Sequence, residues 1–455
     1  MGLNKGQEEA TRVLTEWYND KTSGKELATL EGWAGTGKTY MTKEFITSLN
    51  LSRVLVSAPT NRAKGVIEKS SGFAGKTVHS VLGLQLDLDL SDFNPMNPVF
   101  NPKRPPDVNY QLIVIDEASM INKNLYQRLK ELAAEKKVKM LFMGDRFQLP
   151  PVKERISKVF TDCEYKAVLT EIVRQGKGNP NTKLIELCIK DIQERTDNVD
   201  GFIMRESQNI TPMGLADSKG FIYTPTSSFN SVDFLKADRD NLYNNSSKYL
   251  AYTNDNISKA INGIRKNVFH IEDFITIGES LVGYRGISIK RGKVLDTVIV
   301  NSEDYVVKDI IKSVLQEGMD GYQILIENFY TKHTKYVNVI DTSNEHTAQT
   351  YLEIVRNLYV TAKKFGRQYW VKYYNFVNNN LAMIDVKMFI AGKDERIKQK
   401  DILYNYGITI HKSQGGTFTN SFVNLSNINR CYDNEDRRRL KYVALSRCTN
   451  VNIII

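Results

Sequence analysis

The chain has 455 residues, which is too long for one hydrophobic core, so two or more packed domains are expected. Its hydrophobic fraction of 41% and charged fraction of 25% are those of a soluble globular protein, and no segment is apolar for long enough to cross a bilayer. The formal net charge of +10 favours a polyanionic partner, because basic residues release counterions when they neutralise phosphates.

The cysteines and the N-terminus indicate the cellular setting. The chain has 4 cysteines and none forms a C-x-x-C pair, which argues against a disulfide framework and against a zinc site. The first residues lack an apolar core followed by a cleavage site, so we expect no secretory signal. A reducing, cytoplasmic setting follows.

The predicted elements begin with a helix in the first 18 residues. Ala10, Leu14 and Trp17 recur at helical spacing, and Asn4 followed by Gln7 is typical of a capping box. Short apolar runs then alternate with helical or loop segments, which is typical of a parallel sheet buried between helices. These runs are 27–30, 54–58, 112–115 and 140–143. A second series predicts a second α/β unit, with runs at 249–253, 408–410, 422–425 and 451–455.

Two segments interrupt this pattern. Residues 84–110 contain five prolines, which fix φ and remove backbone donors, so a projecting loop or short hairpin is predicted. Residues 270–400 begin with a β-rich part, which we expect to form a small antiparallel barrel. Its predicted strands are 274–277, 297–300, 305–307, 323–326 and 336–340. The part from 349 to 376 is crowded with Tyr, Trp and Lys and is predicted to be helical, as a packed insertion rather than a binding surface.

A phosphate-binding loop is predicted at 32–39, where GWAGTGKT fits G-x-x-x-x-G-K-[ST] between an apolar strand and a helical run. In this motif glycines let backbone N–H groups wrap around phosphate oxygens, Lys38 reaches the β and γ phosphates, and Thr39 binds magnesium. The predicted nucleotide contacts are Gly32, Ala34, Gly35, Thr36, Gly37, Lys38 and Thr39.

Two carboxylates follow the apolar run at 112–115. Asp116 at the strand end can hold Mg²⁺ together with Thr39, and Glu117 is placed to orient or deprotonate an attacking water. The alternative is that both carboxylates only cap a helix over 118–132.

Further short segments, taken in chain order, complete the set. They are Gln7, the phosphate loop, SAPTNRA at 57–63, TVHS at 77–80, DEAS at 116–119, GDRFQLPP at 144–151, LTEIVRQ at 169–175, YTN at 252–254, ITIHKSQG at 408–415 and VALSR at 443–447. The set resembles the motifs of superfamily 1 helicases, subgroup B, most closely the Dda and RecD branch. The resemblance covers nearly the whole chain, from residue 7 to residue 447.

This resemblance implies an α/β fold with two RecA-like P-loop NTPase domains built on parallel sheets. The first domain would span 1–180 and carry a strand-separating pin at about 84–110. Residues 181–270 would form a linker and the start of the second domain, and 271–400 an insertion with an SH3-like β part followed by a helical part. Residues 401–455 would complete the second domain.

The resemblance also implies roles in ATP hydrolysis. Gln7 would contact adenine, unless its amide serves only the helix cap, and Gln148 would sense the γ-phosphate. Arg174 and Arg447 would be arginine fingers that stabilise charge on the transferring phosphoryl group, although Arg174 could be an ordinary surface residue. The predicted catalytic residues are Lys38, Asp116, Glu117, Gln148, Arg174 and Arg447.

Other motif residues would hold DNA through hydroxyl, amide, imidazole and ammonium groups, which bind backbone without reading sequence. They are Pro59, Thr60, Asn61, Thr77, His79, Thr253, Asn254, His411 and Lys412. Either histidine could instead be structural. Phe93 and Phe100 are the candidate wedges in the pin, where an aromatic ring can stack on the terminal base pair or only anchor the loop.

The sequence therefore predicts an ATP- and Mg²⁺-dependent DNA helicase that moves 5′ to 3′ on single-stranded DNA, in replication, recombination or repair. The alternative is a translocating ATPase, stimulated by single-stranded nucleic acid, that remodels protein–DNA complexes without processive unwinding. Expected partners are single-stranded DNA, single-/double-strand junctions and single-stranded-DNA-binding or replication proteins. The motor is expected to be a monomer in the cytoplasm, the host's if the chain is phage-encoded. A plain P-loop kinase would leave Arg447 unexplained, and a fused nuclease would need more chain after it.

Overall fold

The structure, a computed structural model, describes residues 2–22, 24–86, 100–102, 106, 108–174, 178–225, 230–291, 294–383, 386–389 and 396–455. It divides into two units. The larger unit comprises Met1–Leu84, Pro102–Val268 and Gly407–Ile455, and the smaller unit comprises Gln85–Asn101 and Phe269–Tyr406. Within the described ranges, no helix combines the length and apolar character needed to cross a membrane.

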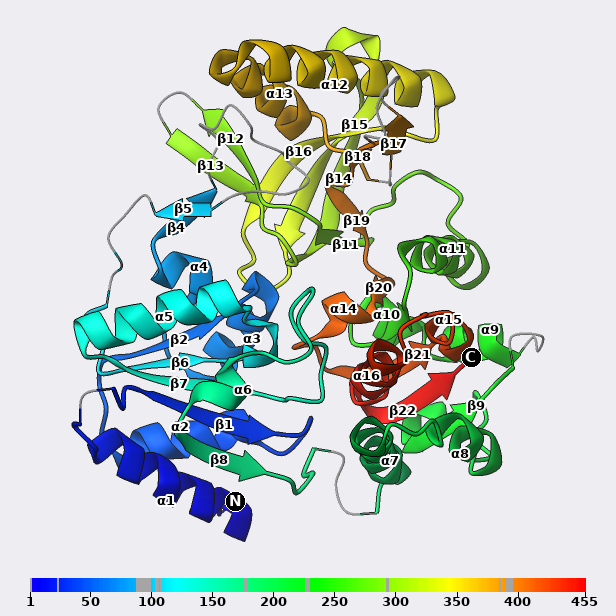
Figure 1. Cartoon of the computed structure of the whole chain (residues 1–455). Coiled ribbons are helices and arrows are strands. Elements are labelled where there is room, and N and C mark those ends of the chain that lie inside the picture. The colour runs from blue at the N-terminus through cyan, green and yellow to red at the C-terminus, as the bar shows by residue number, and fades with distance from the viewer. Residues whose placement is uncertain are drawn as a thin grey trace. The chain divides into compact units, whose positions relative to one another are not determined.

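The first sheet of the larger unit has six strands, all parallel, in the order β3-β2-β6-β7-β1-β8 (Figure 1). The four apolar runs predicted in this part of the chain form its four central strands. Its members are β1 (Leu27–Gly32), β2 (Val54–Ala58), β3 (Gly75–Thr77), β6 (Leu112–Ile115), β7 (Lys139–Gly144) and β8 (Tyr165–Leu169).

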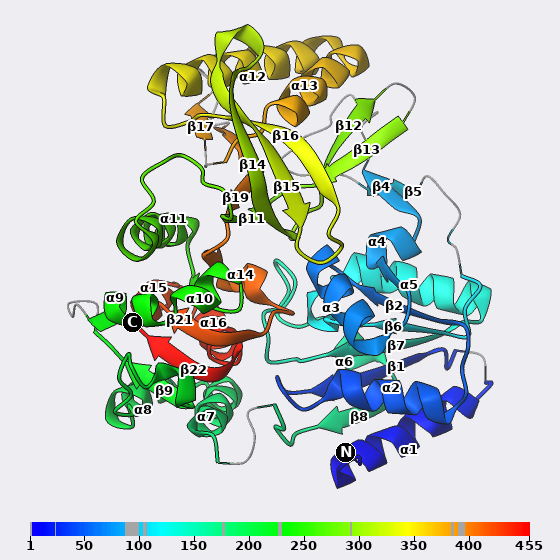
Figure 2. The same ribbon diagram turned by 180° about the vertical axis from the view of Figure 1, so that it is seen from behind.

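Both faces of this sheet are buried because successive side chains of a strand point to opposite sides. In β6, Ile113 and Ile115 join one core cluster, whereas Leu112 and Val114 join another. Figures 1 and 2 show the sheet from opposite sides, with α5 over one face and α2 and α3 over the other. The helices of this half are α1 (Lys5–Asn19), α2 (Lys38–Ser48), α3 (Asn61–Ser71), α4 (Val78–Val81), α5 (Lys123–Lys136) and α6 (Val159–Asp162).

The second sheet of the larger unit has five parallel strands in the order β20-β10-β21-β22-β9. Each of the four late apolar runs overlaps one of its strands, so the predicted second α/β unit is present. The strands are β9 (Gly220–Tyr223), β10 (Lys248–Ala251), β20 (Gly407–Thr409), β21 (Phe418–Val423) and β22 (Cys448–Ile454). Its helices are α7 (Pro180–Glu194), α8 (Val199–Arg205), α9 (Asn230–Ala237), α10 (Arg239–Tyr243), α11 (Asn254–Ile264), α14 (Ile410–Ser413), α15 (Leu425–Ile428) and α16 (Asn434–Leu445).

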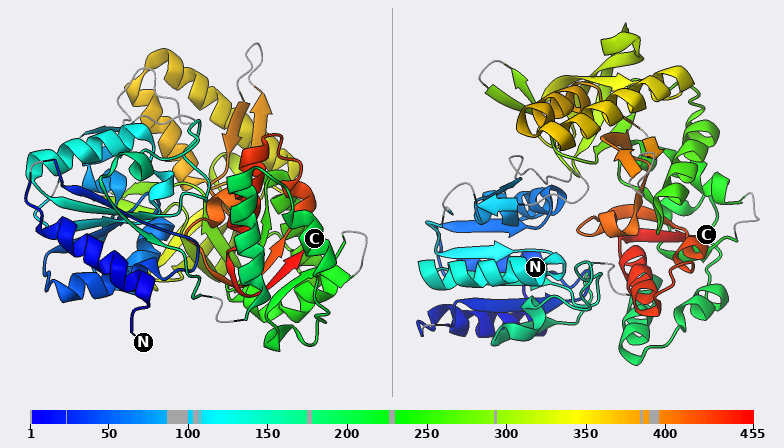
Figure 3. Two further views of the ribbon diagram at one scale, coloured as in Figure 1. Left: turned by 60° about the horizontal axis from the view of Figure 1, so that its bottom comes forward. Right: turned by 45° about the horizontal axis from the view of Figure 1, so that its top comes forward.

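The smaller unit is built on an antiparallel sheet in the order β16-β15-β14-β11-β19. Its strands are β11 (Ser280–Gly283), β14 (Asp304–Val314), β15 (Asp320–Asn328), β16 (Thr334–Ile340) and β19 (Ile402–Tyr404). Two separate two-stranded ribbons pair β12 (Ile287–Arg291) with β13 (Val294–Ile299) and β17 (Val386–Phe389) with β18 (Arg396–Gln399). An SH3-like form of this sheet stays a prediction. The expected helical part is α12 (Glu345–Phe365) and α13 (Arg367–Asn379), which pack side by side (Figure 3) around buried Tyr351 and Trp370.

Two local predictions were wrong. The predicted strand at 274–277 is a turn, in which Thr276 N–H donates to Glu279 Oε2 at 3.2 Å and Gly278 has φ +87°. The sheet therefore starts only at Ser280. The helix considered over 118–132 is broken, because a single 3₁₀ turn at Ala118–Met120 ends before α5 begins.

The proline-rich segment 84–110 is described only in part. β4 (Leu84–Leu86) pairs with β5 (Phe100–Pro102), which agrees with a hairpin at the base of the segment. Phe93 lies outside the described residues. Phe100 begins β5, and its role as a wedge stays a prediction.

Candidate nucleotide site

The phosphate loop joins the end of β1 to the start of α2, as the sequence predicted. Gly35 and Gly37 have φ of +84° and +79°, in the left-handed region that glycine adopts without a steric penalty. Gly32 is required for a different reason, since a Cβ there would lie 2.6 Å from Thr36 Oγ1. The N-terminus of α2 opens directly behind this loop, where its free N–H groups favour an anion.

Lys38 bends back over the loop. Its Nζ donates to the carbonyl oxygens of Gly32 at 2.7 Å and Trp33 at 3.1 Å. Burial lowers the pKa of the ammonium, and Asp145, Asp116 and Glu117 oppose this shift. The lysine is thus held beside the loop by neutral carbonyls, and a phosphate would offer it a stronger, charged acceptor.

The carboxylates of Asp116 and Glu117 follow β6. Asp116 Oδ1 accepts the N–H of Glu117 at 2.8 Å, and burial raises the pKa of Asp116. Burial and the neighbouring Asp116 also raise the pKa of Glu117 to about 7. Glu117 makes no helix-cap hydrogen bond, and Oε2 is buried without a partner. These facts favour the catalytic interpretation of the pair over capping, because α5 is capped by Asn122 instead.

Two guanidiniums lie across from these carboxylates. Desolvation and the nearby Arg447 lower the pKa of Arg174 to about 10. Arg174 lines the cavity but is exposed, and its role as an arginine finger stays a prediction. The hydrogen bonds of Arg447 all go to the part of the larger unit that is built on the second sheet. It donates to Val443 O at 3.0 Å, Ser446 Oγ at 3.0 Å and Gly416 O at 3.4 Å. Gln148 Oε1 is buried without a partner. Unpaired buried groups and adjacent like charges are the features expected of a site that awaits a polyanion.

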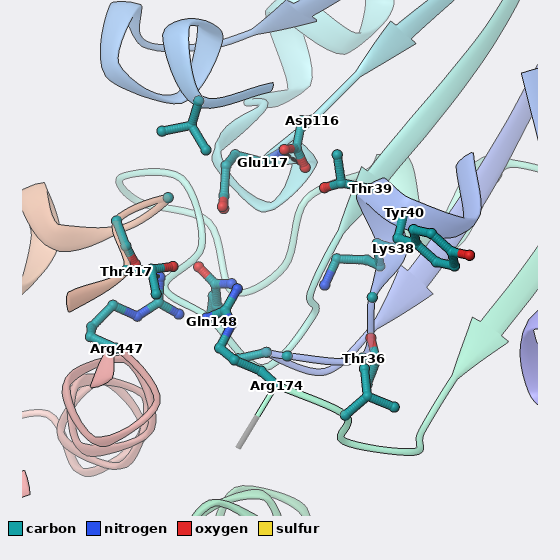
Figure 4. A pocket seen from close by; sticks show the side chains of 17 residues that line it. Thr36, Lys38, Thr39, Tyr40, Asp116, Glu117, Gln148, Arg174, Thr417 and Arg447 are labelled. Atoms are coloured by element: carbon teal, nitrogen blue, oxygen red, sulfur yellow. Dashed lines mark hydrogen bonds between the residues drawn. The ribbon is translucent and has the colours of Figure 1, made fainter. Parts of the chain in front are cut away.

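One cavity of about 290 Å³ brings these groups together (Figure 4). All six predicted catalytic residues line it, although they come from five separate stretches of the chain. The lining also includes the predicted loop residues Ala34, Gly35, Thr36, Gly37 and Thr39. Sequence reasoning missed Tyr40, Val66, Val173, Gly415, Gly416 and Thr417. Gly415 was within a recognised motif and could have been found, whereas Val66 carries no sequence signal.

Gln7 has two structural roles beside the cavity, whose lining includes neither Gln7 nor Gly32. Its Oε1 accepts the N–H of Asn4 at 3.1 Å, which completes the predicted capping box of α1. Its Nε2 donates to Thr36 O at 3.2 Å, so the same side chain also ties α1 to the phosphate loop. Contact with adenine stays a prediction.

The predicted Mg²⁺ ligands suit that ion. Figure 4 shows the hydroxyl of Thr39 turned toward the carboxylate of Asp116, and both line the cavity. No group of three His, Cys, Asp or Glu side chains that could hold a metal occurs in the part of the chain that the structure describes. Magnesium does not need one, because it is usually held by one or two protein oxygens together with phosphate and water.

The predicted DNA-contacting threonines share one structural position. Thr60, Thr77 and Thr253 follow the carboxyl ends of parallel strands and accept the N–H three residues later, at 3.2, 3.3 and 3.4 Å, as N-caps of α3, α4 and α11. Thr409 is the N-cap residue of α14, without a side-chain cap hydrogen bond, and was not among the predicted residues. The repeated T-x-H spelling at 77–79 and 409–411 was a signal that could have found it.

The remaining predicted DNA residues lie next to these caps. Pro59 precedes the first, Asn61 and Asn254 begin helices, and His79 lies in α4. His411 and Lys412 lie in α14, where the ring of His411 is exposed and 6.0 Å from that of Tyr252. Burial lowers the pKa of His79, which favours its neutral imidazole. Contact with DNA stays a prediction for all of them.

The chain is similar to known proteins in sequence and in fold. A family model described as an AAA domain matches residues 2–200. The Dda helicase of Enterobacteria phage T4 is 28% identical over 298 residues, which cover 62% of this chain and 60% of that protein. The Pif1 helicase of Campylobacter jejuni is 26% identical over 442 residues, which cover 93% of this chain and 87% of that protein.

On fold, a solved structure of two Pif1 helicases coordinating at forked duplex DNA covers 100% of this chain and 92% of its own, with a TM-score of 0.51 and 14% identity. That likeness supports the arrangement of two RecA-like sheets. The sequence matches and the order of the motifs make the chain similar to the helicases Dda and Pif1, in agreement with the resemblance to subgroup B of the superfamily 1 helicases.

Proposed function

We propose that this chain is an ATP-dependent DNA helicase, which moves along single-stranded DNA and separates duplex strands. The observation that carries the proposal is that one cavity is lined by Lys38, which begins α2 beside the first sheet, and by Arg447, which lies between α16 and β22 beside the second sheet. A simple NTPase needs only the first set of groups. A motor also needs groups from the second-sheet half, because ATP hydrolysis must change the position of one half relative to the other.

The chain's own residues have separate tasks in the proposed reaction. The phosphate loop and Lys38 bind the β and γ phosphates, and Thr39 with Asp116 would hold Mg²⁺. The bound ion would neutralise charge on the phosphate oxygens. Glu117, with a pKa of about 7, accepts a proton from the attacking water. Arg174 and Arg447 stabilise the charge that develops on the transferring group.

The threonine caps suggest how hydrolysis acts on DNA. Each half presents helix N-termini at the carboxyl ends of its parallel strands, where an N–H group and a hydroxyl can hold a phosphate without reading a base. If the two halves grip alternately, each ATP advances the protein along the strand. A duplex step is held by only about 1.4 kcal/mol on average, so forward motion behind a wedge suffices to open it.

Replacing Lys38 tests the site. Lys38→Ala should lower ATP hydrolysis by about a hundredfold or more, because a positioned donor to the developing charge is lost. Lys43→Ala is the matched control, since Lys43 is exposed on the same helix. The measurement is steady-state ATPase with and without a single-stranded oligonucleotide, and unchanged hydrolysis in Lys38→Ala would rule out this site.

A strand-displacement assay separates the helicase from the remodelling ATPase. Wild-type protein should release a labelled strand from a tailed duplex only with ATP and Mg²⁺. Hydrolysis that the oligonucleotide stimulates, without any strand release, would favour the remodelling function instead.

A further inference from the structure

The larger unit has two halves, one built on the first sheet and one on the second sheet. Helix α16 belongs to the second-sheet half and makes contacts with the first-sheet half that the motifs do not explain. Tyr442 and Arg439 lie one turn apart on α16, and Arg447 follows its end. Both residues bond to the half that carries the phosphate loop, at separations of 291 to 408 residues in sequence. Ala34 and Leu149 of that half also belong to the same hydrophobic cluster as α16.

Tyr442 bridges two elements of the nucleotide site. Its hydroxyl accepts the N–H of Ala34 at 2.9 Å and donates to Asp145 Oδ2 at 2.5 Å. Its ring packs edge-on against Phe147 with centroids 6.5 Å apart. Burial and Asp145 hold the pKa of the phenol well above its usual range, so the hydroxyl stays protonated and keeps donating. The phosphate loop, the end of β7 and α16 thus meet at one oxygen atom.

Arg439 fixes the next stretch of the same half. Its Nη1 donates to the carbonyl oxygens of Arg146 at 2.6 Å and Gln148 at 3.0 Å, while Glu435 holds the rest of the guanidinium. The backbone of Gln148, whose side chain lines the cavity, is therefore attached to α16 as well.

Arg447 takes its place from α16. Its hydrogen bonds reach Val443, Ser446 and Gly416, all in the second-sheet half. Because Arg447 is fixed to α16 and α16 is fixed to the phosphate loop through Tyr442, the tyrosine sets where the guanidinium lies relative to a bound nucleotide.

We propose that Tyr442 is a positioning residue for hydrolysis, which acts through Arg447 by holding α16 against the phosphate loop and Asp145. The inference rests on the proposed function, because it concerns the same reaction. It assigns a role to a side chain outside the cavity lining, and it explains why a polar tyrosine is fully buried at this point.

The test uses Tyr442→Phe, which keeps the ring and removes both hydrogen bonds. Tyr249→Phe is the matched control. The buried hydroxyl of Tyr249 accepts a hydrogen bond from Asn424 Nδ2 at 2.8 Å, and both residues belong to the second-sheet half. We expect kcat for ATP hydrolysis to fall about tenfold in Tyr442→Phe, as for the loss of one hydrogen bond to a charged group. KM for ATP should stay within about twofold, because a group that acts in the transition state changes kcat alone.

A double variant tests the route of the effect. If Tyr442 acts through Arg447, adding Tyr442→Phe to Arg447→Ala should lower kcat no further. Additive losses, or a loss in Tyr442→Phe no larger than in Tyr249→Phe, would overturn the inference. Arg439→Lys is a second variant in case Tyr442→Phe folds poorly, and it should also lower kcat at constant KM. A wild-type protein without DNA-stimulated ATPase would instead overturn the proposed function, so the two failures are distinct.

Discussion

Two half-buried carboxylates, Asp116 and Glu117, line the cavity together with one lysine and two guanidiniums. Desolvation raises the pKa of both carboxyls and lowers the pKa of Lys38 and Arg174, so it disfavours the charged form of these four groups. Glu117 has the left-handed φ of +51°, a conformation that glutamate rarely adopts and that is found at functional sites. These residues therefore lower the stability of the folded protein at the site where the proposed reaction takes place.

The raised pKa of Glu117 makes stability depend on pH. Between the ordinary glutamate pKa and about 7, the unfolded chain loses this proton before the folded chain does, so the free energy of unfolding falls as pH rises. Glu117→Gln removes the dependence. The variant should therefore gain Tm relative to wild type at pH 8 and show little gain at pH 5, while its ATPase is lost.

Thermal unfolding across this pH range measures the difference. Glu131→Gln, on the exposed face of α5, is the control and should follow the wild-type curve. A gain for Glu117→Gln that is the same at pH 5 and pH 8 would contradict the assignment of the buried proton to Glu117.

Several helices begin with a threonine N-cap at the carboxyl end of a parallel strand, where we propose that DNA binds. A threonine ends the strand or the short turn after it, caps the helix, and leaves the helix N-terminus facing the same edge of the sheet. The cap itself contributes about 1 kcal/mol to stability. The cap uses only the hydroxyl oxygen, and the hydroxyl hydrogen of Thr253 makes a long 3.5 Å contact with Asn427 Oδ1, which a phosphate oxygen would replace.

Thr253 tests that double role. Thr253→Ala should lower the affinity for single-stranded DNA several-fold and reduce Tm slightly, whereas Thr253→Ser keeps the hydroxyl and should restore both. Fluorescence anisotropy with a labelled oligonucleotide at fixed salt gives the affinity. Equal DNA binding by the alanine and serine variants would show that the threonine is a cap only.

Helix α1 is anchored by a buried lysine. Lys139 Nζ donates to the carbonyl oxygens of Trp17 at 2.9 Å, Asp20 at 2.6 Å and Lys25 at 2.8 Å. Lys139→Met keeps the aliphatic stem but removes three hydrogen bonds, and Asp20 O loses its donor while Trp17 O keeps the Asp20 N–H and Lys25 O keeps Trp17 Nε1. The loss should cost about 2 kcal/mol and lower Tm by several degrees. Calorimetry should show almost no change for Lys136→Met, whose ammonium pairs with exposed Glu135. A Tm loss of that small size for Lys139→Met would show that the anchor adds little.

On the scale of the whole molecule, two parallel sheets close one nucleotide cavity, and each contributes threonine caps at its strand ends. If both sets of caps hold one strand, the direction of travel depends on which half leads. We expect 5′ to 3′ movement because the motifs resemble those of subgroup B helicases.

A comparison of tailed duplexes tests the direction. The protein should unwind a duplex with a 5′ single-stranded tail and leave one with a 3′ tail intact, with Lys38→Ala as the inactive control for both. Release from the 3′-tailed duplex alone would mean that the two halves advance in the opposite order.

Much of the fold and the site could be predicted because the signals were local. The strand before the phosphate loop, the glycines with positive φ and the carboxylates after β6 follow from spacing alone. The run at 274–277 was misread as a strand because it is apolar, whereas the turn that Thr276, Gly278 and Glu279 form depends on a side-chain hydrogen bond. The contacts of Tyr442 were beyond prediction, since they join positions 408 and 297 residues apart in sequence.

The strand order of the second sheet has a consequence for synthesis of the chain. Strands β9 and β10 are made before the smaller unit, but their neighbours are β22 for β9, and β20 and β21 for β10, all from residue 407 onward. The first sheet, complete at β8, can fold while the ribosome is still translating, whereas β9 and β10 must wait with unpaired edges. The nascent chain should therefore depend most on chaperones after β10 is made and before the strands from residue 407 onward are made. Products truncated in this interval should aggregate rather than persist as folded fragments.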